Sequence, residues 1–164
     1  MRGNENMLLI VGAIIISIIS FCMGRFVKKD MDEQRIDKAT QAAERYHNMF
    51  LVMNRWVQKR NENKQIAKYL LDKGFYNVSI YGMGDIGKTL FKELKNSDVQ
   101  VAYVLDRNAD CMYAGCDIYS LQDELQQVDA VIVTTLMDFE EIKKDITKKM
   151  ECKIISVEEI VFGL

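Results

Sequence analysis

A glycine-rich loop, residues 82–87 (GMGDIG), is the feature that most constrains the fold of this 164-residue chain. Its G-x-G-x-x-G pattern directly follows a predicted strand, Asn77–Tyr81, and opens a predicted helix, Asp85–Lys95. In this setting the first glycine permits a tight turn, the second lets a phosphate approach the backbone, and the third allows the helix to pack closely. The N–H groups and partial positive charge at the start of such a helix favour an anion. The loop therefore predicts a phosphate site.

From Tyr76 onward, predicted strands alternate with helical segments. The later strands are Val99–Leu105, Asp117–Tyr119, Ala130–Thr134 and Lys153–Ser156, and the later helical segments are Leu121–Gln126 and Phe139–Lys149. Strands separated in this way imply a parallel sheet with crossover connections. We therefore expect an α/β fold: a small doubly wound, parallel-sheet (Rossmann-like) domain over residues 61–164, preceded by a transmembrane helix and a helical stalk.

The end of the second predicted strand carries a second candidate contact. Asp106 lies about 20 residues beyond Gly87, where a carboxylate can accept hydrogen bonds from ribose hydroxyls. An acid there suits an unphosphorylated ribose, although the neighbouring Arg107 weakens that distinction. The predicted binding residues are the loop positions Gly82, Met83, Gly84, Asp85, Ile86 and Gly87, together with Asp106 and Arg107. This combination is typical of a dinucleotide site, for which NAD is the candidate cofactor.

Two other interpretations of the loop stay open. The Asp85 carboxylate can compete with phosphate for the same N–H groups or act as a simple N-cap, so the glycines can also serve only the sharp turn. The letters from Gly82 to Thr89 also fit the P-loop pattern G-x-x-x-x-G-K-[ST]. A P-loop needs a later Walker-B acid, whereas the AVIVTT strand ends in threonines and its flanking acid, Asp129, precedes it. The dinucleotide type of loop is therefore favoured.

A second feature, Met7–Gly24, contains 18 consecutive positions without a charge, and ten of them are Leu, Ile, Val or Phe. A helix of this length spans roughly 27 Å, close to the hydrocarbon thickness of a bilayer. The N-terminal flank is neither strongly basic nor followed by a small-x-small cleavage site, which argues against a signal peptide. We predict a transmembrane helix over residues 7–24, with residues 1–6 as a short extracytoplasmic tail.

The flanks of this run predict its orientation. Between Arg25 and Arg45 there are six basic residues, whereas the N-terminal side offers only Arg2 and the amino terminus. The positive-inside bias therefore places the rest of the chain in the cytoplasm, as a single-pass protein of the cell membrane. The net charge of −2 provides no general electrostatic basis for binding nucleic acid.

Residues 25–60 predict a helical stalk. From Met31 to Arg60 there is no Gly or Pro, and apolar residues follow 3-4 spacing at Ile36, Ala39, Ala43, Tyr46, Phe50, Met53 and Val57. This is the a/d pattern of a coiled coil about three heptads long, so a homodimer through the stalk is expected. The alternative is that the stripe packs on the chain's own domain. After the stalk, Asn61 or Asn63 is expected to cap a second helix that ends near Lys73, with Gly74 after it.

The stretches NVSIYGMGDIGKTLFKELKNSDVQVAYVLDRNAD, DAVIVTT and CKIISVEEIV together resemble small Rossmann-type nucleotide-binding domains associated with bacterial surface-polysaccharide biosynthesis. Similar domains occur at the N-termini of sugar acyltransferases and in nucleotide-sugar-handling proteins. The resemblance covers Lys64–Leu164. It implies that the three glycines face phosphates, that Asp106 faces a ribose, and that Thr134 and Thr135 face the ligand. It also implies polysaccharide-synthesis enzymes as partners.

The sequence shows no catalytic constellation. Its one histidine lies in the stalk, and the only Tyr-x-x-x-Lys pattern, Tyr69–Lys73, precedes the glycine loop. We therefore expect a membrane-anchored nucleotide-binding module that acts as a sensor, scaffold or partner in envelope-polysaccharide synthesis. The alternatives are an NAD-dependent oxidoreductase or epimerase component completed by another chain, and a structural membrane adaptor with an empty fold.

Overall fold

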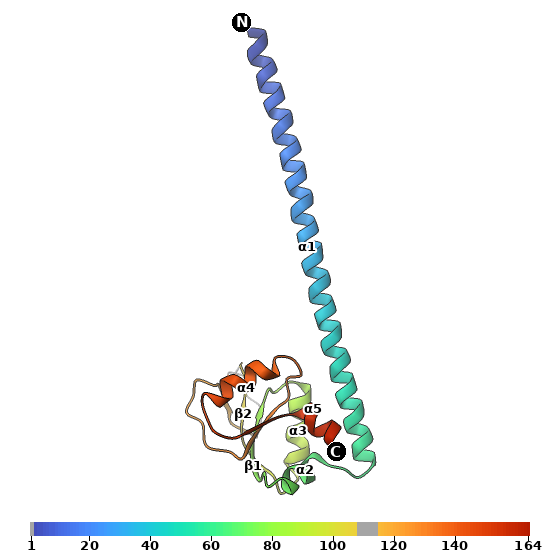
Figure 1. Cartoon of the computed structure of the whole chain (residues 1–164), viewed down its shortest axis with the longest axis vertical. Coiled ribbons are helices and arrows are strands. Elements are labelled where there is room, and N and C mark those ends of the chain that lie inside the picture. Colours follow the sequence, from blue (N-terminus) through green and yellow to red (C-terminus); the bar gives the residue numbers. More distant parts are fainter. Residues whose placement is uncertain (1, 108–114) are drawn as a thin grey trace. The chain divides into compact units, whose positions relative to one another are not determined.

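The computed structural model describes residues 2–107 and 115–164, apart from the side chains at positions 2–11, 13–16, 18, 19, 22, 26 and 30. In chain order the elements are α1 (Arg2–Asn61), α2 (Ile66–Asp72), β1 (Asn77–Tyr81), α3 (Asp85–Leu94), β2 (Gln100–Leu105), β3 (Ile118–Tyr119), β4 (Ala130–Val133), α4 (Phe139–Thr147), β5 (Lys153–Ser156) and α5 (Val157–Gly163) (Figure 1). The chain forms two compact units, Met1–Glu44 and Arg45–Leu164.

The second unit is built on a five-stranded sheet with the order β3-β2-β1-β4-β5. All its pairings are parallel. β1 lies at the centre, where Ile80 pairs with Val104 on one side and with Ile132 on the other. The predicted parallel α/β architecture is confirmed, and this strand order is compatible with a Rossmann-like fold.

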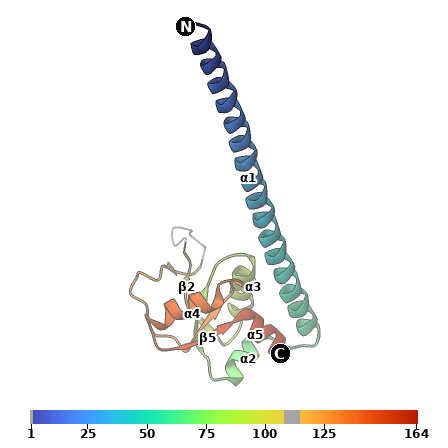
Figure 2. The ribbon, with the colours of Figure 1, turned by 45° about the horizontal axis from the view of Figure 1, so that its top comes forward.

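Helices cover both faces of the sheet (Figures 1 and 2). One face forms a core with α2, α3, α5 and the end of α1, and it contains Ile80, Val104 and Ile132 from the strands. The opposite face packs against α4 through Tyr103, Val131 and other alternate strand residues. Because successive residues of a strand point to opposite faces, β4 (AVIV) has to be apolar throughout, and it is fully buried.

The C-terminal part of α1 belongs to the domain. Val52 and Trp56 are 1% and 2% exposed, and both lie in the same core as α3 and α5. Met49 and Met53 pack against the edge of this core. The compact unit accordingly begins at Arg45 rather than at residue 61, because one side of the predicted stalk supplies core side chains.

Glu93 on α3 joins three helices. Its Oε1 accepts the backbone N–H of Ile66 at 2.9 Å, and its Oε2 accepts Nε1–H of Trp56 at 2.9 Å. Arg60 adds a 3.3 Å ion pair to Oε2. The side chain of Glu93 is only 6% exposed, so little water competes for these bonds. Glu93 thus caps α2 from a neighbouring helix and connects α1 to α3.

This cap differs from the local one that the sequence predicts. The residue before α2 is Gln65, whose side chain makes no capping hydrogen bond. α1 continues through Asn61, and Asn63 adopts φ 58° in the connection, so the prediction that one of these asparagines caps α2 is wrong. The predicted end of α2 is confirmed: Lys73 is the C-cap, and Gly74 follows with φ +80°.

Two further differences lie in the second half of the domain. The predicted helical turn over Leu121–Gln126 is wrong, because no helix forms over these residues. The chain instead makes a short non-helical turn, in which the Asp123 carboxylate accepts the N–H of Ser120 at 2.7 Å. The sequence analysis also missed α5. Its signal is a capping pattern, since Ser156 accepts the N–H of Glu159 at 3.0 Å.

The first unit contributes helix α1 up to Glu44. Among the residues that the structure describes, no helical stretch combines the length and the apolar character needed to cross a membrane. The predicted span, Met7–Gly24, falls mostly on side chains that lie outside the described residues. The transmembrane helix therefore stays a prediction from the sequence.

The Glu93 contacts predict a measurable loss of stability. Glu93→Ala leaves the N–H groups of Ile66 and Trp56 without their acceptor, and we expect it to lower the free energy of unfolding by about 2–3 kcal/mol. Glu93→Gln retains one acceptor oxygen and should cost less. Urea denaturation followed through the fluorescence of Trp56, the one tryptophan of the chain, measures both. Lys92→Ala, on an exposed position of the same helix, is the control. An equal effect of Glu93→Ala and Lys92→Ala would contradict this role.

Candidate functional site

The candidate site lies where the chain reverses its path through the sheet. The strands on either side of this point, β1 and β4, are neighbours, but their following helices, α3 and α4, cover opposite faces. Doubly wound sheets bind ligands outside the carboxyl ends of the strands at this position. Residues 82–87 follow β1 here, and Thr134 and Thr135 follow β4. The structure thus brings together the two loops that the sequence singled out.

Gly82 and Gly87 are required by the fold itself. Gly82 has φ +94°, a left-handed conformation that side chains disfavour, and a Cβ there would lie 3.0 Å from the hydroxyl oxygen of Thr134. A Cβ on Gly87 would lie 2.0 Å from the carbonyl oxygen of Gly82. These two glycines let the chain turn sharply and let α3 start directly against the loop, which are the roles that the pattern predicts.

Gly84 is different, because nothing in the fold requires a glycine there. Its φ of −68° and ψ of −168° are open to any residue. A Cβ built on it would meet no atom within 4 Å. Gly84 is the N-cap of α3 and is exposed, and no side chain caps this helix. The missing side chain leaves the start of α3 open to solvent at this position.

Asp106 is bound to the loop. Its Oδ2 accepts the backbone N–H of Met83 at 2.7 Å, across 23 positions of the sequence. A charge-assisted bond of this length fixes the loop relative to the end of β2. Sequence analysis placed Asp106 at the site but missed this contact, because a backbone donor leaves no mark on the residue pattern. The predicted contact with a ribose stays a prediction.

The two threonines after β4 occupy different positions. Thr134 is 6% exposed, and its hydroxyl donates to the carbonyl oxygens of Tyr81 at 3.1 Å and Gly82 at 2.8 Å. Thr134 therefore stabilises the start of the glycine loop from its buried side. Thr135 is exposed, and its hydroxyl oxygen is 3.1 Å from the Cβ position of Gly82, so it lies at the surface of the loop. Of the two, Thr135 has the position from which a ligand can be reached.

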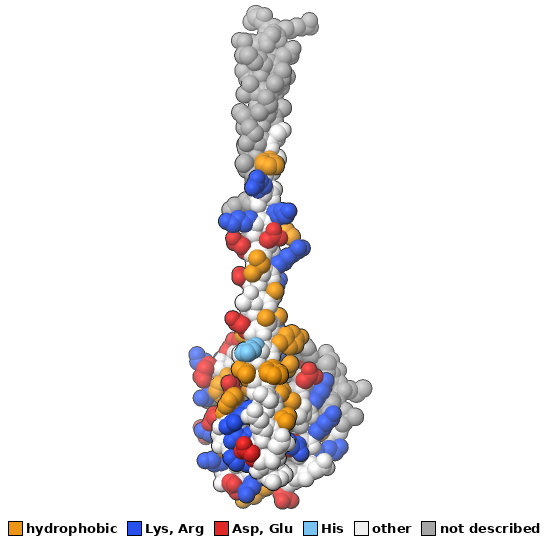
Figure 3. Space-filling view, turned by 90° about the vertical axis from the view of Figure 1, so that its right-hand side faces the viewer, with side chains coloured by type: hydrophobic (Ala, Val, Ile, Leu, Met, Phe, Trp, Pro, Cys, Tyr) orange, Lys and Arg blue, Asp and Glu red, His pale blue; other side chains and the backbone are white. Residues whose placement is uncertain are grey.

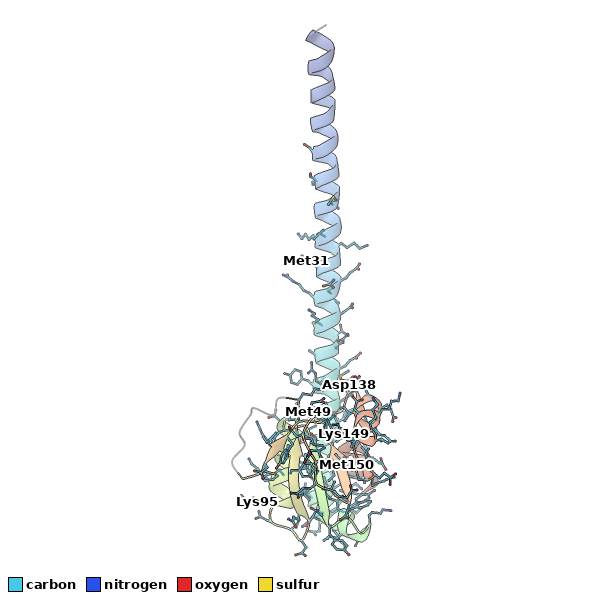
Figure 4. All side chains as sticks on the ribbon, turned by 90° about the vertical axis from the view of Figure 1, so that its left-hand side faces the viewer. Met31, Met49, Lys95, Asp138, Lys149 and Met150 are labelled. Carbon is cyan, nitrogen blue, oxygen red and sulfur yellow. The ribbon has the colours of Figure 1, made fainter. Side chains whose placement is uncertain are left out.

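Arg107 interacts with a side chain of β1 and with carboxylates at the start of α4. A hydrogen bond with the Tyr81 side chain, with smaller effects of the Glu141 and Asp138 carboxylates, raises the pKa of Arg107. Asp138 is the N-cap of α4 and marks the end of the domain at which that helix begins (Figure 4). Arg107 thus lies among side chains near the start of α4, whereas Asp106 contacts the loop before α3. Tyr81 was not predicted as a site residue; its position directly before the first glycine is the signal.

The described residues offer no other constellation for chemistry. They contain no group of three His, Cys, Asp or Glu side chains placed to hold a metal ion. Burial raises the pKa of the Cys116 and Cys152 thiols, which makes these thiols poor nucleophiles. Cys111 lies outside the described residues. What the arrangement can do is present backbone donors and a carboxylate to an anionic, hydroxyl-bearing ligand.

Comparison with known proteins adds no family to this description. No family model, no curated protein and no solved structure matches the chain. The resemblance to domains of polysaccharide biosynthesis therefore stays a prediction, and the function has to be inferred from the geometry of the loop.

The contrast between two glycines can be tested directly. Gly87→Ala forces a methyl group against the Gly82 carbonyl, and we expect it to lower the free energy of unfolding by about 1–3 kcal/mol. Gly84→Ala enters open space and should change it by less than about 0.5 kcal/mol. Urea denaturation of the two variants measures the difference. Equal stabilities would mean that α3 does not pack against the loop as described.

Proposed function

We propose that the Arg45–Leu164 unit is a nucleotide-binding module whose phosphate site lies at Gly84. The observation that carries this proposal is the open space at Gly84 in a conformation that does not need glycine. The turn explains Gly82 and the packing of α3 explains Gly87, but neither explains Gly84. A phosphate that approaches the backbone at this position accounts for the absence of a side chain.

The donors around this space suit an anion. α3 has ten residues, and its first N–H groups are not satisfied by a capping side chain. The partial positive charge of a helix N-terminus favours a phosphate there. Asp85 in the first turn is exposed, so a ligand and this carboxylate can occupy different sides of the helix start.

The carboxylate of Asp106 supports the choice of a nucleotide over a free phosphate. It lies beside the loop at Met83, close to the place where a ribose would follow the phosphates. An acid there favours a ribose without a 2′-phosphate, so the expected ligands are NAD or a nucleotide sugar. The resemblance noted in the sequence favours a nucleotide sugar of envelope-polysaccharide synthesis.

We further propose that Met7–Gly24 anchors this module in the cell membrane, with the domain in the cytoplasm. The support is the run of 18 uncharged residues and the basic residues that follow it. A module held in this way would act as a sensor, scaffold or partner of membrane-bound enzymes that use the same nucleotide.

The binding proposal predicts a ranked set of affinities. A panel of NAD, NADP, UDP, UDP-sugars and ATP is first screened by thermal shift, and the ligand found is titrated calorimetrically. Gly84→Val fills the open space and should abolish binding while stability is kept. Asp106→Ala should weaken binding roughly ten- to hundredfold, and Asp106→Asn less. Lys88→Ala should matter little, whereas a P-loop would need this lysine.

Two outcomes would contradict the proposal. If no compound of the panel shifts the melting temperature, the loop serves only the turn and the fold is empty. If a ligand binds equally well to wild type, Gly84→Val and Asp106→Ala, it binds elsewhere. Because Asp106 also holds the loop through Met83, the Gly84 variant is the more direct of the two tests.

The anchor proposal predicts the topology of the chain. Protease added to intact cells should leave the domain uncut, because the basic flank retains it in the cytoplasm. Protease added after permeabilisation should digest it. Digestion of the domain in intact cells would contradict the orientation, and recovery of the chain in the soluble fraction would contradict the anchor.

A further inference from the structure

Helix α1 has two apolar sides, and the domain covers only one of them. Val52 and Trp56 face the core at 1% and 2% exposure. At roughly 100° per residue, Phe50 lies about 160° around the helix from Val52 and about 120° from Trp56. Phe50 is accordingly 63% exposed. The contact of α1 with the domain is therefore made mainly by Val52 and Trp56, which lie outside the heptad stripe, and Met53 is the stripe residue that packs against the edge of the core.

The exposed stripe is long and rich in large side chains. Ile36, Tyr46, Phe50 and Val57 are 64%, 66%, 63% and 54% exposed. Figure 3 shows hydrophobic side chains gathered along the part of α1 that belongs to the domain. A row of apolar residues at regular spacing differs from the scattered exposed residues of an ordinary surface. Such a row marks a surface that another apolar surface covers.

We propose that this stripe is the interface with a second copy of the chain, in a parallel coiled coil over Ile36–Val57. The stripe alternates 3-4 over three heptads, with Ile36, Ala43, Phe50 and Val57 at a and Ala39, Tyr46 and Met53 at d. This spacing keeps one side of a helix facing an identical helix. The pairing does not depend on nucleotide binding; its parallel orientation follows from the proposed membrane anchor.

The charge pattern beside the stripe and the apolar area that the stripe exposes are both compatible with a second copy of the chain. The e and g positions from Ile36 to Val57 carry no Lys, Arg, Asp or Glu, so in a parallel pair no like charges face each other along this stretch. The exposed apolar area of the stripe is roughly 500 Å² per chain, or about 1,000 Å² for a pair. That is the lower limit for a specific interface, so the dimer should be reversible rather than permanent.

Disulfide cross-linking of the full chain in membranes tests the seam. In a background with the four native cysteines replaced by serine, Ala39→Cys and Ala43→Cys place thiols at d and a, where the same residue of the two chains meets. Both variants should form covalent dimers under mild oxidation. Gln41→Cys and Asn48→Cys lie on the opposite side of α1 and should not. Equal cross-linking at all four positions, or none at Ala39 and Ala43, would overturn the proposal.

A matched pair of substitutions tests how much Phe50 contributes to the stability of the dimer. In sedimentation experiments on the full chain in detergent, Phe50→Asn should weaken self-association at least tenfold. Leu51→Asn removes the neighbouring exposed residue, which is 43% exposed on another side of the helix, and should leave the dimer unchanged. A monomeric wild-type chain at about 100 μM, or a dimer insensitive to Phe50→Asn, would overturn the proposal. Binding of a monomeric chain to lipid vesicles through the stripe would show that a membrane surface covers it instead.

Discussion

The arrangement of the domain depends on the buried carboxylate of Glu93. α3 carries this residue near its end and the glycine loop at its start, so one helix of ten residues connects the candidate site with α1. Glu93 holds the indole of Trp56 and the first N–H of α2 with bonds of 2.9 Å. A charged acceptor with two buried donors is costly to leave incomplete, because each unpaired group would lose its hydrogen bond to water as well. The end of α1 is therefore fixed to the helix that forms the loop.

The three glycines of the loop show how one pattern combines structural and functional requirements. Gly82 has a positive φ, and a Cβ on Gly87 would collide with a carbonyl oxygen. The fold therefore requires both glycines whether or not a ligand binds. Gly84 satisfies neither condition, because its backbone angles do not need glycine and a Cβ there would meet no atom within 4 Å. The backbone N–H of Met83 donates to Asp106, so the acid that is expected to contact the ligand also fixes the shape of the loop. Preorganisation of this kind lowers the cost of ordering a site on binding.

Helix α1 shows why one amphipathic period can conceal two surfaces. Met53 belongs to the heptad stripe and also packs at the edge of the core, whereas Trp56 and Val52 lie in the core and outside the stripe. Sequence spacing alone identified the stripe but assigned it either to the domain or to a partner. The burial of Trp56 shows which side of the helix the domain occupies, and Met53 lies at the border of that side. The exposed aromatic residues Tyr46 and Phe50 are then left for another surface.

The sequence by itself determined the parallel α/β architecture, the bounds of most strands and the position of the glycine loop, since periodicity and glycine placement are local signals. It also contained the capping pattern of α5, which went unrecognised. Only the tertiary structure decided the cap of α2, which comes from Glu93 on another helix, and which side of α1 is buried. It alone also separated Gly84 from Gly82 and Gly87. The reason is physical: caps from distant side chains, empty space and the side of a helix that is buried depend on atoms far apart in the sequence.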